Sequence, residues 1–281
     1  MKYDCNLTRN RLLEKVSSEI KEKNIHPTLV IITCSDDEAS KIYVRNKLKV
    51  CEQVGIKATH YVLNPITTTE EELKETIYNC NLNFNGIIIQ LPLCDRLKHL
   101  EKECIELISP EKDVDGLTLR NQALLLNNDK KAIVPATARA CYEIIKDLTT
   151  YENLDVTIVN RSNLIGKPLQ ALLTNKNYTV TLCHSKTRYL KTKTFAPNIV
   201  IVGVGKPDYF DKTYFREHQI VLDCGINRVD GKLKRDVREN VSEIIGVKLA
   251  SNVGVVTTVC IALNLLDCYK LQQRGKLNEK N

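Results

Sequence analysis

An aromatic ring and an amine, Tyr43 and Lys47, are the first side chains that could act on one ligand. They are four residues apart, so on a helix they lie on the same face, one turn from each other. Together they could present themselves to one flat, polar molecule. The same spacing also fits a solvated lysine beside a half-buried tyrosine, so the pair alone does not decide between a site and a surface.

Further polar residues follow at places where open α/β sheets bind ligands. Gln90 interrupts the apolar run GIIIQLPL just before Pro92, at the expected C-terminal end of a strand. Ligands of open α/β sheets bind at these strand ends, so this amide is a candidate site residue, although an edge amide facing water fits as well. Asp113 and Asp115 precede Gly116 in the segment SPEKDVDG, a pattern that also fits a simple turn.

The elements that carry these residues are predicted from hydrophobic periodicity. Short apolar runs alternate with helical stretches, which indicates an α/β fold whose largely parallel sheets are covered by helices on both faces. The helix with Tyr43 and Lys47 is predicted to start at the capping-box spacing Ser35-Asp-Asp-Glu38 and to run to about Val54. The predicted strands are Thr28–Thr33, Gly86–Leu91, Val156–Asn160, Thr179–Cys183, Asn198–Val202 and Ile220–Asp223.

A second set of candidate residues follows the strand VTIVN. The loop from Asn160 to Gly166 leads into a helix predicted to begin near Pro168, because proline is common in the first helical turn. A strand, a loop with glycine, basic and hydroxyl residues, and a helix N-terminus together can bind the phosphates of a dinucleotide. The GxGxxG fingerprint is absent and only Gly166 remains, so the segment also fits a plain helix start.

The end of the next strand predicts which dinucleotide would bind. NAD enzymes hold the ribose 2′-hydroxyl with an acidic residue about 20 positions after the glycine turn. Here the strand TVTLC ends in HSKT, without a carboxylate, and a 2′-phosphate would meet Arg161, Ser185 and Lys186. This favours NADP, with NAD as the alternative, and we expect His184 to shape the turn.

The two sets of residues lie in separate parts of the chain, which predicts two domains. We expect an N-terminal α/β domain over residues 1–137, completed by a C-terminal helix over 256–281 that returns to it. A Rossmann-like, parallel-sheet dinucleotide domain is expected over 138–255.

Composition limits the classes to which the chain can belong. Of the 281 residues, 43% are hydrophobic and 27% are charged, which suffices for a buried core and argues against wholesale disorder. The chain has no uninterrupted apolar run of the ~18 residues that a bilayer crossing requires. The N-terminus mixes acids with bases and has no apolar leader segment. We therefore expect a cytoplasmic protein with no membrane partner.

Charge and cysteine content argue against two other classes. The net charge of +7 comes from 41 Lys and Arg against 34 Asp and Glu and is spread along the chain. This pattern favours anionic small ligands over nucleic acid. The eleven cysteines include no CxxC pair, so we expect buried, small hydrophobic side chains and no metal site.

Six motifs, SDDEASKIYVRNKLKVCEQVGI, IIIQLPL, SPEKDVDGLT, NRSNLIGKPL, CHSKT and DCGINR, occur in this order along the chain. They resemble the bifunctional methylenetetrahydrofolate dehydrogenase/methenyltetrahydrofolate cyclohydrolase family. The resemblance implies an enzyme of one-carbon metabolism that oxidises 5,10-methylenetetrahydrofolate with NADP and hydrolyses the 5,10-methenyl product to 10-formyltetrahydrofolate. It also implies a homodimer.

The resemblance assigns roles to four residues of the first half as a folate site. Tyr43 would stack on the pterin, and Lys47, hydrogen-bonded by Gln90, would act at the one-carbon centre. Asp115 would hold the amide and amino edge of the pterin through two hydrogen bonds. The resemblance adds Leu91, Pro92 and Gly254 to the folate site, and it implies a cofactor site made of Asn160, Arg161, Ser162, Ile165, Gly166, Ser185, Gly203, Gly205 and Ile226.

The chain departs from the family pattern at several places. Asn160 replaces the family's glycine before Arg-Ser and is similar to NAD-dependent, monofunctional fungal relatives. Arg235 replaces the glycine of a Gly-Asp-Val motif, and Ala138 replaces a proline. Most prolines and glycines of a ligand-bordering loop are replaced within Lys248–Val255, which should change the shape of that loop. The alternatives are therefore a monofunctional, possibly NAD-dependent dehydrogenase and a catalytically weakened ligand-binding protein.

Overall fold

The computed structural model describes residues 1–278, in which the chain folds into two compact units. The three-stranded unit consists of Arg11–Ala136 and the chain from Thr258 onward. The five-stranded unit consists of Met1–Asn10 and Thr137–Thr257. The last three residues of the predicted C-terminal helix, 279–281, lie outside the described residues.

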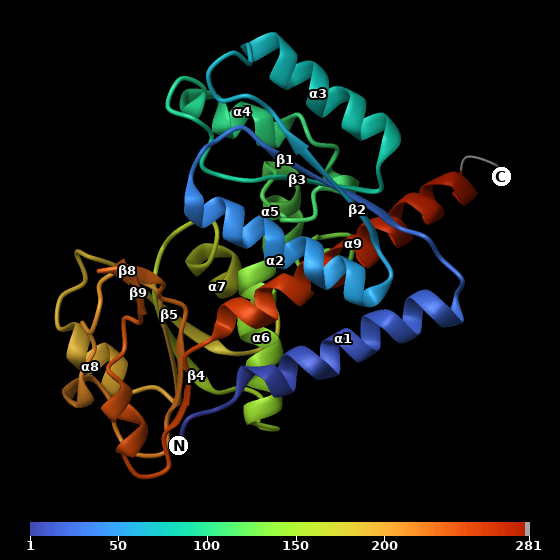
Figure 1. The fold of residues 1–281 in the computed structure, drawn as a ribbon. Coiled ribbons are helices and arrows are strands. Elements are labelled where there is room, and N and C mark those ends of the chain that lie inside the picture. Colours follow the sequence, from blue (N-terminus) through green and yellow to red (C-terminus); the bar gives the residue numbers. More distant parts are fainter. Residues whose placement is uncertain (279–281) are drawn as a thin grey trace. The chain divides into compact units, whose positions relative to one another are not determined.

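The three-stranded unit contains a parallel sheet with the strand order β2-β1-β3. Figure 1 shows these strands running between α3 and α2. Its core packs Leu73 and Ile77 of α3 against the fully buried Val30 and Ile32 of β1. The elements are β1 (Thr28–Thr33), α2 (Glu38–Val54), β2 (Lys57–Val62), α3 (Glu70–Asn83), β3 (Gly86–Ile89), α4 (Glu101–Glu106) and α5 (Leu119–Leu126).

The helix that carries Tyr43 and Lys47 forms as expected, but its cap differs from the prediction. α2 begins at Glu38, and the carboxylate of Asp37 accepts the backbone N–H of Ser40 at 2.7 Å. The hydroxyl of Ser35 instead accepts the backbone N–H of Asp37. The predicted Ser35 cap was wrong because a carboxylate closer to the helix supplies the stronger acceptor.

Strand β2 was not predicted from the sequence. It pairs in parallel with β1, with Lys57 opposite Thr28 and Val62 opposite Thr33. Most of its side chains are exposed, in contrast to the fully buried strand β3. Without a continuous apolar run, hydrophobic periodicity had no signal to detect at this edge of the sheet.

The C-terminal helix α9 runs from Val253 to Asn278, so it starts three residues earlier than predicted. From Thr258 onward it belongs to the three-stranded unit, as the sequence predicted for a helix that returns to the first domain. By length and composition, Val253–Gly275 could cross a membrane, although 61% of its most apolar window is buried within the protein. The core helix of a water-soluble domain passes the same test.

The five-stranded unit contains an all-parallel sheet with the order β10-β7-β6-β4-β5 and a separate antiparallel pair, β8-β9. The predicted strands of this half are present, and helix α7 begins at Gly166, two residues before the predicted start. The elements are α6 (Ala136–Leu148), β4 (Asp155–Val159), α7 (Gly166–Thr174), β5 (Thr179–Cys183), α8 (Leu190–Phe195), β6 (Ile199–Val202), β7 (Ile220–Asp223), β8 (Asn227–Val229), β9 (Lys232–Lys234) and β10 (Lys248–Ala250).

The first ten residues belong to the five-stranded unit, although we expected them in the first domain. Lys2 forms a parallel bridge to Leu249, within strand β10. The amino group of Met1 donates to the carbonyl oxygens of Ser242 and Val247. The N-terminal segment thus extends a sheet edge from the far end of the chain before α1 (Cys5–Glu22) begins.

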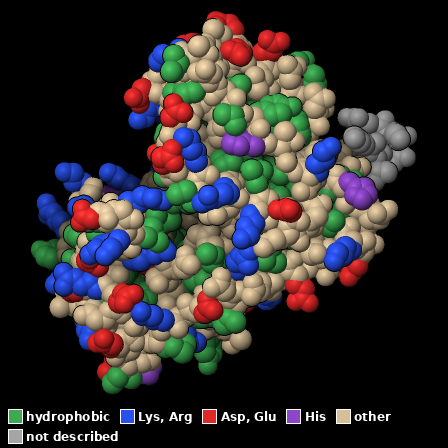
Figure 2. Space-filling view, viewed as in Figure 1, with side chains coloured by type: hydrophobic (Ala, Val, Ile, Leu, Met, Phe, Trp, Pro, Cys, Tyr) green, Lys and Arg blue, Asp and Glu red, His purple; other side chains and the backbone are tan. Residues whose placement is uncertain are grey.

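The visible surface carries charges of both signs, and most cysteines are buried. On the face shown in Figure 2, Lys and Arg side chains are frequent over the part that carries α8, β8 and β9, and Asp and Glu side chains lie among them. All eleven cysteines are free thiols, and all but Cys94 and Cys224 are buried. In the described part of the chain, no three His, Cys, Asp or Glu residues are grouped so that they could hold a metal ion.

Candidate active site

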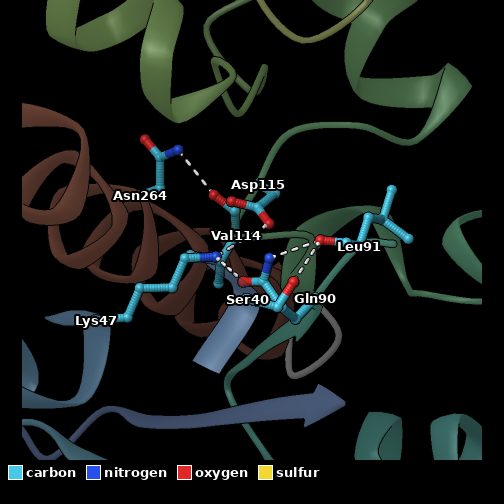
Figure 3. Close-up of polar contacts among 7 residues, drawn as sticks. All are labelled: Ser40, Lys47, Gln90, Leu91, Val114, Asp115 and Asn264. Carbon is cyan, nitrogen blue, oxygen red and sulfur yellow. Dashed lines mark hydrogen bonds and ion pairs between the residues drawn. The ribbon is translucent and has the colours of Figure 1, made fainter. Parts of the chain in front are cut away.

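Lys47, Gln90 and Asp115 meet in the three-stranded unit (Figure 3). The ammonium Nζ of Lys47 donates to Oε1 of Gln90 at 3.1 Å and lies 3.9 Å from Oδ2 of Asp115. The side chain of Lys47 is 12% exposed and that of Asp115 is 24% exposed, so the group is shielded yet reachable from solvent. The helix α2, the end of β3 and the loop before α5 each contribute one member.

The amide of Gln90 has a defined orientation. Its Nε2 donates to the backbone carbonyl of Leu91 at 2.8 Å, and that oxygen can only accept. The oxygen Oε1 is therefore the atom that faces the ammonium group of Lys47. Strand β3 ends at Ile89, which places Gln90 and Leu91 immediately beyond the C-terminal end of the strand.

The two aspartates of the loop before α5 differ in their hydrogen bonding. Asp113 is buried, and its Oδ2 accepts the backbone N–H of Thr118 and the side-chain amide of Asn121. Asp115 has no hydrogen-bond donor among the described residues, and its carboxylate keeps acceptor positions for a ligand. Gly116 follows with φ +68°, and a Cβ there would lie 2.5 Å from the carbonyl oxygen of Ile133, so this turn requires glycine.

The charge state of Asp115 depends on opposing effects. Burial raises its pKa above the ordinary value of 3.8, the positive charge of Lys47 lowers it, and the nearby Asp113 raises it further. Loss of the lysine charge would therefore favour the protonated, neutral form of Asp115. The ammonium group thus helps to keep a carboxylate available as a double acceptor.

Tyr43 lies one helical turn before Lys47 on α2, and 37% of its surface is exposed. It makes no hydrogen bond within the described part of the chain, which leaves its ring available for stacking. Leu91 is half-buried and Pro92 is exposed, and both directly follow Gln90. Gly254, also expected at this site, lies in the first turn of α9 and belongs to the five-stranded unit.

Sequence reasoning missed two residues that hold this site in place. Ser40, one turn before Val44 on α2, is buried and donates to the carbonyl of Leu91 at 3.3 Å. Asn264 is buried in α9 and donates to the carbonyl of Val114 at 2.8 Å (Figure 3). It also donates to the carbonyl of Val134 at 2.8 Å. A buried amide in the apolar segment CIALNLLDC was the available signal, because such a group requires partners.

In the five-stranded unit, Asn160 organises the loop after β4. Its Oδ1 accepts the backbone N–H groups of Ser162 and Gly166 and the hydroxyl of Ser162, and its Nδ2 donates to the carbonyl of Gly203. The hydroxyl of Ser162 in turn accepts the N–H of Ile165 at 3.1 Å. A Cβ at Gly166 would overlap the carbonyl group of Asn160, so only glycine fits there.

The register of the sheet brings the expected cofactor residues to one edge. Val159 of β4 lies opposite Cys183 of β5 and Val202 of β6, so the loops after these strands are neighbours. Beyond β5, His184 shapes the turn as expected, because its N–H donates to Thr187 and its Nδ1 accepts from Lys186. Arg161, Ser185 and Lys186 are all exposed beyond these strand ends. This donor set, without a carboxylate, fits a ribose 2′-phosphate.

Further along the same edge, the loop after β6 is held by a buried carboxylate. Asp236 accepts the backbone N–H groups of Val204, Gly205 and Lys206 at 2.5 to 3.0 Å. Gly205 has φ +68°, which favours glycine. Ile226, beyond β7, is 41% exposed and presents an apolar side chain to solvent.

Comparisons with known proteins match both halves of the chain to the same family. A family model described as the catalytic domain of tetrahydrofolate dehydrogenase/cyclohydrolase matches residues 4–115, and one described as its NAD(P)-binding domain matches residues 135–273. The bifunctional protein FolD of Bacillus pumilus is 40% identical over 271 residues, which cover 92% of each chain.

Solved structures show the same similarity. The bifunctional 5,10-methylenetetrahydrofolate dehydrogenase/cyclohydrolase of Thermoplasma acidophilum has a TM-score of 0.91 at 30% identity, over 98% of this chain and all of that one. The FolD enzyme of Trypanosoma brucei, complexed with NADP and an inhibitor, has a TM-score of 0.84 at 27% identity, over 96% of both chains. The predicted two-domain α/β fold with parallel sheets is confirmed.

Proposed function

The chain belongs to the tetrahydrofolate dehydrogenase/cyclohydrolase family, and from this membership we propose a bifunctional enzyme of one-carbon metabolism. It oxidises 5,10-methylenetetrahydrofolate to 5,10-methenyltetrahydrofolate with NADP and hydrolyses the product to 10-formyltetrahydrofolate. The observation that carries the proposal is the ammonium group of Lys47 between Gln90 and Asp115, beside a carboxylate with unused acceptor positions.

We propose that the folate binds at this group. The carboxylate of Asp115 accepts two N–H groups from the pterin edge, which is the pairing that a carboxylate forms best. The exposed ring of Tyr43 stacks on the flat pterin, and Leu91 and Pro92 contribute the neighbouring wall. These contacts position the one-carbon centre for both reactions, which makes alignment their main contribution to the rate.

In the hydrolysis step, water adds to the methenyl carbon and a C–N bond of the ring then opens. Lys47 is the group placed to move protons during these steps, and Gln90 fixes the position of its Nζ. Because Gln90 is itself held by the carbonyl of Leu91, the position of the amine depends on the backbone beyond β3.

In the oxidation step, NADP supplies a hydride acceptor when it is bound. We propose that Asn160, Ser162, Ile165 and Gly166 shape the loop for the phosphates, and that Arg161 and Ser185 bind the 2′-phosphate. Gly203, Gly205 and Ile226 form further walls of this site. The support is the shared sheet edge and the absence of a carboxylate beyond β5.

The proposal includes a homodimer that works in the cytoplasm, without a nucleic-acid or membrane partner. The interleaved charges and the absence of a long basic run support the second part. Light scattering coupled to size-exclusion chromatography measures the mass in solution. A mass of one chain, at all concentrations tested, would contradict the dimer.

A cofactor-resolved assay tests the function directly. Purified protein is mixed with 5,10-methylenetetrahydrofolate and either NADP or NAD, and separately with 5,10-methenyltetrahydrofolate alone. We expect faster reduction of NADP than of NAD, together with hydrolysis of the methenyl compound. Absence of both reactions refutes the proposal. Oxidation without hydrolysis indicates a monofunctional dehydrogenase, and faster reduction of NAD overturns the cofactor assignment.

A further inference from the structure

The segment Arg235–Val237 contacts the loops beyond three neighbouring parallel strands. These strands are β6, β7 and β10, which are adjacent in the sheet. Asp236 holds the loop after β6 through three backbone N–H groups, and it also accepts the side-chain amide of Asn227 at 2.8 Å. The backbone N–H of Val237 donates to Asp223 at the end of β7. The segment is therefore anchored firmly through both its backbone and its side chains.

Arg235 extends this anchor to the loop before α9. Its Nη1 donates to the carbonyl of Gly225 at 3.0 Å, and its Nη2 donates to Oδ1 of Asn252 at 3.1 Å. One guanidinium group thus bridges the turn after β7 and the loop after β10.

The bridged segments carry two of the residues expected to contact ligands. Ile226 follows Gly225, and Gly254 lies two residues after Asn252. A Cβ placed on Gly254 would lie 3.8 Å from Cδ1 of Ile226, so these two residues face each other at van der Waals range. The bridge from Arg235 therefore fixes the distance between the two segments close to the contact between Ile226 and Gly254.

We infer that Arg235 is a positioning residue for the dinucleotide, an inference that rests on the proposed function. Its guanidinium group holds the segments of Ile226 and Gly254 at a fixed separation, so this wall of the cofactor site is formed before the dinucleotide binds. Such preorganisation increases affinity because less ordering is required on binding. Only Ser251 and Asn252 link β10 to α9, and the guanidinium group of Arg235 holds this short link through the side chain of Asn252.

The geometry requires arginine in particular. The guanidinium group is planar and presents donors in two directions, whereas lysine presents one compact ammonium group on a flexible stem. Arg235→Lys therefore retains the charge and loses the bridge. Asn252→Asp retains an acceptor for the bridge, while Asn252→Leu removes it.

Two measurements test the inference. Calorimetry gives the dissociation constant for NADP, and hydrogen exchange of the unliganded protein reports the mobility of residues 252–255. We expect Arg235→Lys and Asn252→Leu each to weaken NADP binding about five- to tenfold and to accelerate exchange in this segment. Asn252→Asp should bind NADP as tightly as the wild type. The double variant should be no weaker than either single variant, because both remove the same contact.

The matched control is Arg228→Lys, which changes an exposed arginine on β8 whose side chain makes no hydrogen bond within the described part of the chain. It should leave both measurements unchanged. The inference is overturned if Arg235→Lys binds NADP like the wild type, or if the effects of Arg235→Lys and Asn252→Leu simply add. If the wild type binds no NADP, the proposed function fails, and unchanged exchange in Arg235→Lys then refutes the bridge separately.

Discussion

At the scale of single residues, the three polar members of the proposed folate site depend on one another. Lys47 and Asp115 are both shielded from solvent, and the positive charge of Lys47 favours the carboxylate form of Asp115. Gln90 neutralises no charge, but it fixes where the ammonium group lies. A change at any of the three therefore alters the other two, which makes their effects on activity non-additive.

Replacing Lys47 tests its role in proton transfer. Lys47→Met keeps the approximate length of the side chain and removes its charge, so we expect methenyltetrahydrofolate hydrolysis to fall by at least about 100-fold. Folate binding at neutral pH should weaken as well, because Asp115 loses the charge that favours its carboxylate form. Absorbance of the methenyl compound measures the rate. Lys49→Met, at a more solvent-facing lysine of the same helix, is the control, and equal rates in both variants would contradict the assignment.

The buried carboxyl group of Asp223 should make the free energy of unfolding depend on pH. It is fully buried at the end of β7, and burial raises its pKa from 3.8 to about 7, opposed by hydrogen bonds from Val237 and Gly225. In the unfolded chain this carboxyl loses its proton at lower pH than in the folded protein. The free energy of unfolding should therefore fall as pH rises from about 4 to about 7 and become constant above that.

The variant Asp223→Asn cannot titrate at this position and should lack this part of the pH dependence. The stability of the wild type relative to the variant should decrease by at most about 4 kcal/mol across this window. Urea unfolding at several pH values measures the difference. Asp36→Asn, which changes an exposed carboxyl group, serves as the comparison. A difference between wild type and Asp223→Asn that does not vary with pH would show that Asp223 is not protonated in the folded protein.

At the scale of elements, several expected functional residues in both units follow the C-terminal ends of parallel strands, whereas Tyr43 and Lys47 lie within α2. Gln90 follows β3, Asn160 follows β4, and Gly203 follows β6. This is the rule for open α/β sheets, and it explains why strand prediction located these residues without any contact information. Ser40 and Asn264, which support the proposed folate site, come from helices and donate to backbone carbonyls of the loops.

Asn264 connects α9 to the loop that carries Asp115. In Asn264→Leu the side chain keeps its approximate size and can no longer donate to Val114 and Val134. Two carbonyl groups lose their partner, so we expect about 2–4 kcal/mol lower stability and a higher KM for the folate, with NADP affinity unchanged. Asn127→Leu, at an exposed position, is the control. A loss of stability without any change in the folate KM would show that Asn264 does not position the loop that carries Asp115.

At the scale of the whole molecule, the units are not continuous segments of the chain. Met1–Asn10 joins the five-stranded unit, and the chain from Thr258 onward joins the three-stranded unit. The return of the C-terminal helix was predicted from its amphipathic sequence. The assignment of the first ten residues was not, because a backbone bridge such as the one between Lys2 and Leu249 leaves no pattern in side-chain hydrophobicity.

The sequence by itself determined the alternating α/β order, the buried strands, the family and the polar residues at strand ends. These features depend on local hydrophobicity and on residue identity, which the chain displays directly. The spacing of Tyr43 and Lys47 left open whether they belong to a site or to a plain surface. Hydrophobic patterns also gave no indication of the exposed strand β2, or of the cap at Asp37.

The resemblance had pointed to Asp115, but only the tertiary structure gave a physical reason for the choice, since Asp113 is occupied by Thr118 and Asn121 whereas Asp115 faces Lys47. It likewise revealed Asn264 and the bridge from Arg235 to Asn252. Each of these contacts joins residues between 5 and 150 positions apart. Their hydrogen bonds depend on distances and directions between side chains, which hydrophobic patterns do not encode.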